Sequence, residues 1–237
     1  MTKLQLSGQA PVIPGRRIPL AGLVEQLYAA YGPQGWWPLL GHQGRNPTLT
    51  GRLTGYHPGD YSFPHNEAQR FEICCGAILT QNTAWPNVEK ALLALAKQDL
   101  LAPRNILAAD DERLQQAIRP SGYFRAKARK LREFCEFVLS LAGQTPRRDQ
   151  LLGVWGVGPE TADSILLYAY AQTEMVVDAY TLRVLRHHGY QRSQRSYAAA
   201  KTYCERKLPR SLAGYQEFHA LMVEHAKRLR VADALAT

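Results

Sequence analysis

The chain has 237 residues, of which 46% are hydrophobic, which is enough for one large domain or two modest ones. Its 29 Lys and Arg exceed its 20 Asp and Glu, and the resulting net charge of +9 favours a polyanionic partner, either nucleic acid or an anionic membrane surface. No apolar run is long enough to span a bilayer and none resembles a signal peptide, so we expect a cytoplasmic protein that does not insert into a membrane.

Helical patterns dominate the first half of the chain. Residues 1–18 are interrupted by proline and glycine and are expected to form a flexible arm, whereas 18–32 has helical apolar spacing and ends at Gly32. Residues 33–66 have little periodicity, so we expect a long structured loop of the kind that often carries function. Further helices are expected at 71–81, which is apolar on nearly every side, at 87–97 and at 124–143.

The second half contains a helix, a tight turn and a further helix. A short helix over 148–154 leads into a Gly-Val-Gly turn at 156–158, and Pro159 then stands where the first position of a helix tolerates proline. Residues 175–178 are expected to be an extended connector, because no second β-rich segment is present to pair with them. Two more helices are expected at 196–208, after a Ser196 cap, and at 215–230.

The cysteine and histidine spacings predict no metal and no other cofactor. The four cysteines form no C-x-x-C pair, and buried free cysteine behaves as a small hydrophobe, so we expect packing thiols rather than a zinc or iron–sulfur site. Four histidines of the C-terminal part match no metal-binding pattern and are expected at the surface or at helix interfaces. These residues are Cys74, Cys75, Cys135 and Cys204, and His187, His188, His219 and His225.

The turn at 156–158 has two interpretations. Its glycines let the backbone turn sharply and approach a ligand closely, and the following helix directs N–H groups and its positive dipole end toward the turn, which suits a phosphate. The alternative is an ordinary helix–helix connection, in which glycine is also common. The turn alone favours the ordinary helix–helix connection. The surrounding residues must therefore distinguish it from a phosphate-binding turn.

Three segments together carry a family resemblance. The pattern L-x-x-V-x-G-V-G-x-x-T-A-D-x-I-L-x-x-A at 151–169, followed by V-V-D-x-Y-T-x-R-V-L, resembles the helix-hairpin-helix and catalytic-aspartate segment of endonuclease III-like DNA glycosylases. GAILTQNTAWPNVEKAL (76–92) is similar to the family segment whose glutamine enters the space left by an extruded base, and PSGYFRAKARKL (120–131) is similar to the next block. The resemblance extends from about residue 28 to about 230, and the motifs are specific only in combination.

The resemblance implies an all-α, endonuclease III-like fold with two helical domains and a central cleft. One domain would be a contiguous bundle at 70–177, ending in the helix-hairpin-helix at about 147–171. The other would be discontinuous, joining 19–69 to 178–237. The implied partner is double-stranded DNA that contains a damaged base, and we expect a monomer.

The resemblance assigns catalysis to Asp178. Breaking an N-glycosidic bond builds positive charge on the sugar, which a nearby carboxylate stabilises while it orients or deprotonates the attacking water. Asp178 also fits the N-cap of the helix that follows it. The two roles are compatible because a capped carboxylate stays ionised.

The resemblance also assigns DNA contacts, each with a simpler alternative. The hairpin amides would hold a phosphate, which positions the protein without reading sequence. Gln81 would fill the space that the extruded base leaves in the DNA stack, and Asn82 is a weaker candidate for the same role. The alternative for Gln81 is a polar residue at a helix end that faces solvent. The basic face of the helix expected at 124–143 would contact the DNA backbone; the alternative is a face that is simply solvated. The candidates are Gly156, Val157, Gly158 and Thr161, with Gln81 and Asn82, and Tyr123, Arg125, Lys127 and Arg129.

A pocket for the flipped base would be aromatic. A base alkylated at a ring nitrogen is cationic and already a good leaving group, so the enzyme mainly needs faces that stack against it. Trp36, Trp37 and Phe71 are candidates for this stack. The tryptophans have the alternative of filling the interface between two helical domains.

Two departures from the family pattern narrow the predicted activity. Bifunctional members, which also cut the backbone, have a Schiff-base lysine two residues after the last hairpin glycine, where this chain has Glu160. The chain also lacks the four clustered C-terminal cysteines of endonuclease III, and in this it is similar to the branch that includes bacterial 3-methyladenine DNA glycosylase III. We therefore predict a monofunctional glycosylase that leaves an abasic site.

Several alternatives remain at this point. One is a bifunctional glycosylase and lyase acting on oxidised pyrimidines, with an amine such as that of Lys227 in place of the missing lysine. The others are a mismatch-type glycosylase and a non-catalytic DNA-structure binder that uses the same hairpin.

Overall fold

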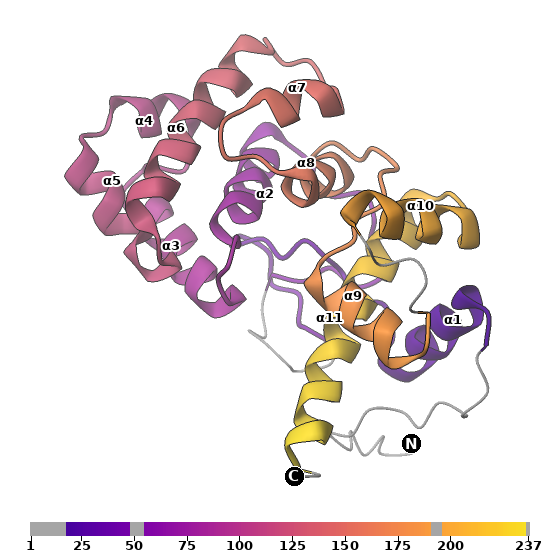
Figure 1. Ribbon diagram of the computed structural model, residues 1–237. Helices are drawn as coiled ribbons and strands as arrows, with labels where there is room; N and C mark the ends of the chain where they lie inside the picture. The colour runs from indigo at the N-terminus through magenta and orange to yellow at the C-terminus, as the bar shows by residue number, and fades with distance from the viewer. Residues whose placement is uncertain (1–17, 48–54, 191–195, 236–237) are drawn as a thin grey trace.

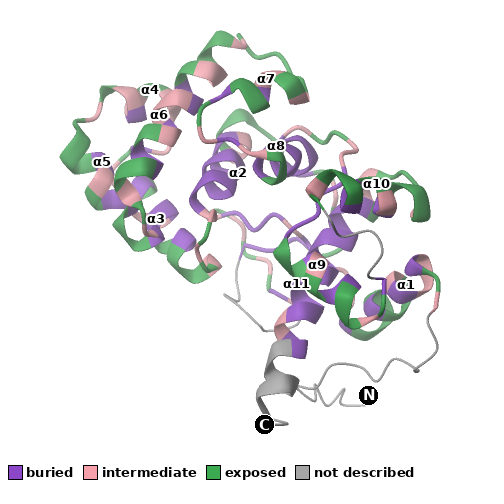
Figure 2. Ribbon diagram, in the orientation of Figure 1, coloured by how far each residue is buried: buried purple, intermediate pink, exposed green. Residues whose placement is uncertain are grey.

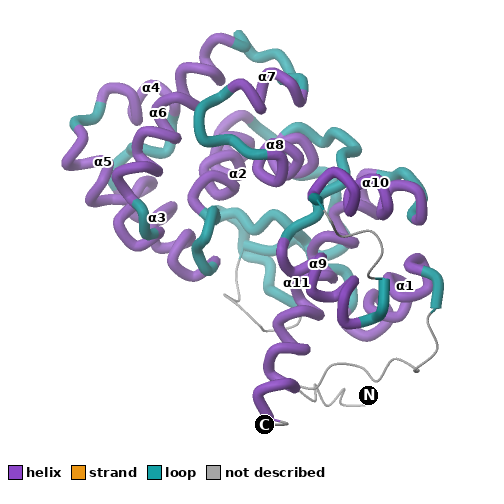
Figure 3. The backbone as a smooth tube through the Cα atoms, in the orientation of Figure 1, coloured by secondary structure: helices purple, strands orange, loops and turns teal. Residues whose placement is uncertain are grey.

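The computed structural model describes residues 18–47, 55–190 and 196–235 (Figure 1). Within these ranges all regular elements are helices and no strand occurs, which confirms the all-α prediction and the extended connector before Asp178 (Figure 3). The predicted arm, 1–18, lies outside the described residues except for Ile18. None of the helices in the described ranges has the length and apolar character needed to cross a bilayer.

One group of helices packs around a central buried helix, α2 (Glu67–Leu79). Every residue from Phe71 to Leu79 is buried, as the purple ribbon in Figure 2 shows, because neighbours cover α2 on several sides. It packs directly against α3 (Trp85–Lys97), α6 (Phe124–Ser140), α8 (Pro159–Ser164) and the π-helical turn η2 (Ile165–Ala169). The group is completed by α4 (Pro103–Ala108), α5 (Asp111–Ile118), the 3₁₀ turn η1 (Arg119–Ser121) and α7 (Arg148–Gly153), which pack on these helices.

A second group is built on the long C-terminal helix α11 (Leu212–Leu235), which packs against α9 (Ala179–His187) and α1 (Leu20–Tyr31). The helix α10 (Tyr197–Lys207) contacts α1 in the same group. The π-helical turn η2 contacts both α2 and α11, and the buried apolar residues of the two groups form one continuous core.

Most predicted helices are confirmed, with differences at their ends. Helix α2 begins four residues earlier than predicted because the Asn66 side chain caps it by accepting from the Gln69 N–H at 3.0 Å. The Ser196 cap of α10 and the stop at Gly32 are present as predicted. Helices α4 and α5 were not predicted. The free cysteines are buried packing residues, as expected.

The described parts of the predicted loop, 33–47 and 55–66, contain no helix, as expected, and connect the two groups (Figure 3). The Glu72 carboxylate of α2 accepts from the Leu40 N–H at 2.7 Å. The Glu217 carboxylate of α11 accepts from the Gln34 N–H at 3.0 and 3.1 Å. Backbone N–H groups that lack a helical partner are thus satisfied by buried acids on both sides.

A buried ionic cluster holds the hairpin helices against α10. Asp163 of α8 is fully buried and accepts from Arg148 Nε at 2.6 Å and Nη2 at 3.2 Å. The same carboxylate accepts from Tyr197 Oη at 2.6 Å and Lys201 Nζ at 2.9 Å, both on α10. Because a buried charge is tolerated only when it is paired, this cluster fixes where the hairpin stands relative to the second group.

Candidate active site

Asp178 is buried at the start of α9, where the extended connector ends. Its Oδ1 accepts from the Thr181 N–H at 2.7 Å and from Thr181 Oγ1 at 2.8 Å, so the N-cap role is confirmed. The second oxygen, Oδ2, lies 3.6 Å from His219 Nε2 on α11. The cap therefore fixes the carboxylate at the point where the connector, α9 and α11 meet.

His219 is held by the core on its other side. Its Nδ1 lies 2.8 Å from the hydroxyl of the buried Tyr168, which also donates to the Gln216 carbonyl at 3.2 Å. A carboxylate oxygen only accepts, so the stable arrangement directs the Nε2–H of His219 toward Asp178. The sequence predicted that His219 lies at the surface or at a helix interface. The structure places it at an interface, between α11 and η2.

The pKa values of Asp178 and Glu160 are shifted in opposite directions. Burial acts to raise the pKa of Asp178, but the nearby His219 and the hydrogen bonds from Thr181 outweigh it, so this pKa is lowered and the group stays ionised. Glu160, in the first turn of α8, keeps exposed surface, yet desolvation by nearby protein atoms raises the pKa of its carboxyl to about 7. The negative charge of Asp178 adds to this shift.

Lys227 brings an amine into the same electrostatic environment. Its Nζ lies 3.9 Å from Glu224 Oε2 on α11. Burial lowers the pKa of Lys227, and the charges of Glu224 and Asp178 partly counteract this.

Gln81 lies against the hairpin rather than in solvent. Its Nε2 donates to the Gly156 carbonyl at 3.1 Å and to Thr161 Oγ1 at 3.0 Å, and its Oε1 accepts from Lys130 Nζ. The alternative of a solvent-facing helix end is therefore wrong. Asn82, the next residue, is exposed and has a positive φ of 53°.

The hairpin turn leaves two of its amides for a ligand. Gly156 adopts a φ of 83°, a conformation that glycine reaches without strain. Val157 is buried and its N–H donates to the Val154 carbonyl at 3.1 Å, so its amide is already used within the turn. In the described part of the chain, the N–H groups of Gly156 and Gly158 have no acceptor.

The prediction that Lys127 contacts the DNA backbone is wrong. The residue is only 2% exposed, and its Nζ donates at 2.7 Å to each of three oxygens, Leu79 O, Ser121 O and Thr83 Oγ1. Burial, and next the charge of Lys130, lower the pKa of Lys127 to about 8. Lys127 instead fixes the turn that carries Gln81.

Other members of the basic helix face are exposed. Tyr123 is 72% exposed and precedes α6 in a left-handed conformation, and Arg125 is also exposed. The guanidinium of Arg129 lies 3.9 Å from the ring centroid of Trp155, which is itself 44% exposed beside the hairpin. This places aromatic and cationic groups next to the turn.

The two tryptophans of the loop occupy different positions. Trp37 is buried and packs edge-on against Trp85 and Tyr168, at 5.5 and 5.2 Å between ring centroids, so it fills the space between helices. Trp36 is half-buried, and its ring centroid lies 5.4 Å from that of His219. Trp36 is therefore the tryptophan near Asp178.

Phe71 is not brought to the tryptophans by any contact among the described aromatic rings. It lines a separate pocket of about 240 Å³ together with Arg70, Leu101 and Tyr170. Trp85, at the start of α3, instead stands beside Trp37.

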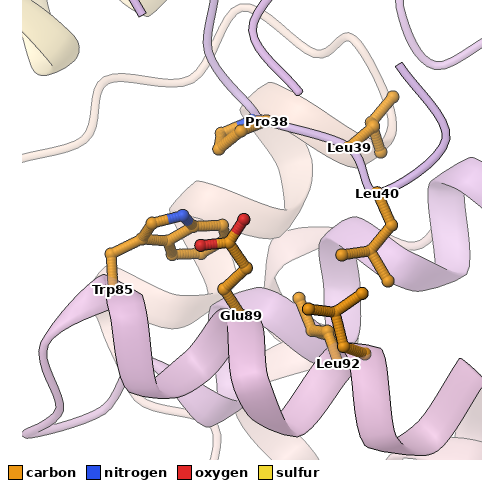
Figure 4. Close-up of a pocket in the computed structure, with 7 residues that line it drawn as sticks. Pro38, Leu39, Leu40, Trp85, Glu89 and Leu92 are labelled. Atoms are coloured by element: carbon orange, nitrogen blue, oxygen red, sulfur yellow. The ribbon is translucent and has the colours of Figure 1, made fainter. Parts of the chain in front are cut away.

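Trp85 lines a small pocket of about 110 Å³ (Figure 4). Pro38 and Leu39 of the loop and Leu92 of α3 form other parts of its wall. The carboxylate of Glu89 lies beside the Trp85 indole in this view.

Four residues beside the candidate site were given no role in it from the sequence: Trp85, Lys130, Trp155 and His219. Trp85 and Trp155 stand directly beside the recognised TQNT and GVG motifs, so their position in sequence was the available signal. The roles of Lys130 and His219 depend on tertiary contacts that no spacing rule reveals.

Comparison with known proteins identifies the family of the chain. Residues 75–210 match the model of the HhH-GPD superfamily of base excision DNA repair proteins. A relative from Methanocaldococcus jannaschii, named as a presumed DNA repair glycosylase, is 37% identical over 216 residues, which cover 86% of each chain. Endonuclease III of Thermotoga maritima is 27% identical over 70% of this chain and 76% of its own.

Solved structures give the same result. The 3-methyladenine DNA glycosylase MagIII of H. pylori, in complex with 1,N6-ethenoadenine, superimposes with a TM-score of 0.61 at 30% identity, over 67% of this chain and 85% of that one. An endonuclease III in a non-covalent complex with DNA gives a TM-score of 0.59 at 26% identity, over 65% and 72%.

The fold and site thus define a helix-hairpin-helix DNA repair enzyme of the endonuclease III-like type. The chain belongs to the HhH-GPD superfamily of base excision DNA repair proteins and is a DNA glycosylase. The alternative of a non-catalytic DNA-structure binder is not retained.

Proposed function

We propose that the protein is a monofunctional DNA N-glycosylase that flips out an alkylated purine, such as 3-methyladenine, and hydrolyses its N-glycosidic bond to leave an abasic site. The observation that carries the proposal is the pair of carboxyl groups, Asp178 and Glu160. The pKa of Asp178 is lowered, and Glu160 stands where bifunctional members have their lysine.

The proposed reaction uses water as the nucleophile. As the bond between C1′ and the base nitrogen breaks, its electron pair leaves with the base and positive charge develops on the sugar. Ionised Asp178 stabilises that charge and accepts the proton that the attacking water loses. His219 keeps the carboxylate ionised and oriented.

A cationic base is the substrate that best fits the aromatic surroundings. Trp36 presents a half-buried ring close to His219, and Trp37 links it to Trp85, whose ring lines a small pocket between the loop and α3. Electron-rich rings attract a positively charged base, and such a base leaves without strong acid catalysis. The relationship to a 3-methyladenine glycosylase structure supports this substrate class. Phe71 remains a candidate without a contact to these rings.

In this proposal, DNA lies across both groups of helices. The group at 70–177 carries the hairpin, whose free amides at Gly156 and Gly158 would hold a phosphate next to the flipped nucleotide. The discontinuous group, 19–69 with 178–237, carries Asp178. Most of the affinity would be electrostatic and therefore sensitive to salt.

The test is incubation of purified protein with methylated duplex DNA, with chromatography to identify each released base and a gel run before and after alkali. We expect 3-methyladenine to be released and strand breaks to appear only after alkali. Release of no alkylated base would remove this substrate class and direct the search to oxidised and mismatched bases.

A glycosylase with a lyase step is the second candidate, with Lys227 of α11 as the amine. Burial lowers the pKa of this lysine, and a lowered pKa favours the neutral amine that forms a Schiff base. Borohydride added during the reaction distinguishes the two candidates. The monofunctional proposal expects no covalent protein–DNA product, whereas a product lost in Lys227→Gln would establish the lyase.

A further inference from the structure

The side chain of Gln81 is held at both ends of its amide. Lys130 Nζ only donates and the Gly156 carbonyl only accepts, so the oxygen and nitrogen of the amide are assigned without ambiguity. Thr161 Oγ1 accepts a second hydrogen bond from Nε2. The residue expected to enter the DNA is therefore docked against the hairpin in the free protein.

The side chain of Lys130 packs against the hairpin turn. A β-carbon on Gly156 would lie 2.6 to 2.8 Å from the Cγ, Cδ and Cε atoms of Lys130, so the lysine stem passes directly across this glycine. The lysine is half-buried, which leaves part of it open to solvent. One ammonium group thus touches Gln81 beside the turn that would receive a phosphate.

The backbone that carries Gln81 is fixed separately. Lys127 binds the carbonyl of Leu79 and the hydroxyl of Thr83, on either side of Gln81. The Gln81 carbonyl accepts from Thr83 Oγ1 at 3.3 Å. Release of the side chain from Lys130 would therefore move the amide without unfolding the turn.

We propose that Lys130 is a positioning residue that couples phosphate binding at the hairpin to the release of Gln81. This inference rests on the proposed function, because it assumes that Gln81 enters the DNA. A phosphate oxygen is a stronger acceptor for an ammonium group than a neutral amide oxygen. When a phosphate reaches the hairpin, Lys130 exchanges Gln81 Oε1 for it, and two neutral hydrogen bonds remain to hold the amide.

The test uses the full chain and a duplex with a tetrahydrofuran abasic analogue opposite 2-aminopurine, a fluorescent base whose emission reports stacking. Equilibrium binding at several salt concentrations counts phosphate contacts, and stopped-flow fluorescence follows insertion. Lys130→Met is compared with wild type, with Lys130→Arg as the rescue, and with Lys97→Met, an exposed lysine near the end of α3, as the control for lost charge.

We expect Lys130→Met to reduce the slope of log K against log salt by about 0.9, the value for one phosphate contact in duplex DNA. We also expect its insertion phase to be roughly tenfold faster, because a hydrogen bond to a charged group no longer restrains Gln81. Lys130→Arg should restore both values and Lys97→Met should change neither. A change in the slope alone, in the insertion rate alone, or in neither would overturn the coupling.

A second variant tests the exchange without altering Lys130. In Gln81→Ala the ammonium is free before DNA arrives, so undamaged duplex should bind several-fold more tightly than to wild type; equal or weaker binding would contradict the exchange. None of these measurements requires catalysis. Failure of wild type to release a base would therefore refute the proposed function while leaving the coupling result readable.

Discussion

At the scale of single residues, the site gives two carboxyl groups, Asp178 and Glu160, pKa values that are shifted in opposite directions. Asp178 accepts hydrogen bonds from Thr181 and lies 3.6 Å from His219 Nε2, whereas the carboxylate of Glu160 has no hydrogen-bond partner among the described side chains and is repelled by the charge of Asp178. The sequence predicted that Asp178 caps the helix that follows it, and the structure confirms this cap. The catalytic role came from the family resemblance and stays a prediction. The raised pKa of Glu160 depends on packing that the sequence does not encode locally.

Glu160→Gln should make the protein more stable at high pH. The pKa of Glu160 rises from its ordinary 4.5 to about 7 on folding, so the folded protein takes up a proton between these values and loses stability as pH rises through them. The variant lacks this titration. We expect urea unfolding to show a larger gain in the free energy of unfolding at pH 8 than at pH 5, and an equal gain at both would contradict the assignment.

His219→Phe should move the acid limb of the activity profile. The ring shape is kept, but Asp178 loses a donor that lowers its pKa, so the carboxylate should protonate at higher pH and activity should fall at a higher pH than in wild type. His219→Gln, which keeps an N–H donor, is the matched control. A pH–rate profile for base release that is unchanged in His219→Phe would refute the positioning role.

At the scale of elements, the site is positioned by the packing of α2 against the loop at 33–66, which contains Trp36 and Trp37. Gly76 leaves room for the buried Trp37 indole, because a β-carbon there would lie 2.9 Å from its Nε1. The apolar run of α2 and the irregular character of 33–66 were both readable from sequence. Their mutual contact was not, and neither were the short helices α4 and α5, which depend on tertiary packing rather than on long periodicity.

Gly76→Ala should therefore destabilise the protein despite the better helix propensity of alanine. That preference is about 1 kcal/mol, but forcing the buried indole aside costs roughly 1–3 kcal/mol. Gly22→Ala in α1 is the control, because its β-carbon would meet only Ile18 Cδ1, at 4.0 Å. We expect a lower urea midpoint for Gly76→Ala and an equal or higher one for Gly22→Ala; the reverse order would be incompatible with this packing.

At the scale of the whole molecule, the seam between the two helix groups is more polar than the sequence suggests. Hydrophobic periodicity identified most helices, and the family motifs predicted the all-α fold that the comparisons confirm. The cluster around Asp163 was not predicted, because its partners Arg148, Tyr197 and Lys201 lie 15, 34 and 38 residues from it in sequence. The sequence also misplaced Lys127. Its place on a basic helix face predicts an exposed charge, but the residue is buried and two of its partners are distant in sequence.

Asp163→Asn should destabilise the molecule strongly. The substitution leaves Lys201 and Arg148 with only Glu174, which is partly exposed, as a charged partner, so we expect a loss of about 3 kcal/mol, the lower end of the cost of breaking a buried pair. Asp149→Asn removes an exposed pair with Arg147 and should cost under about 1 kcal/mol. Urea unfolding of both variants makes the comparison, and similar small losses would mean that the cluster does not hold the two groups together.

The most direct test of the central claim is the single-turnover rate of 3-methyladenine release from a defined duplex by wild type and Asp178→Asn. Asparagine still accepts from the Thr181 N–H and caps α9, so the variant should fold and bind DNA while lacking the charge. We predict a loss of roughly 10²–10⁴-fold in rate with binding preserved. A variant that releases the base within about threefold of the wild-type rate would contradict the assignment of catalysis to Asp178.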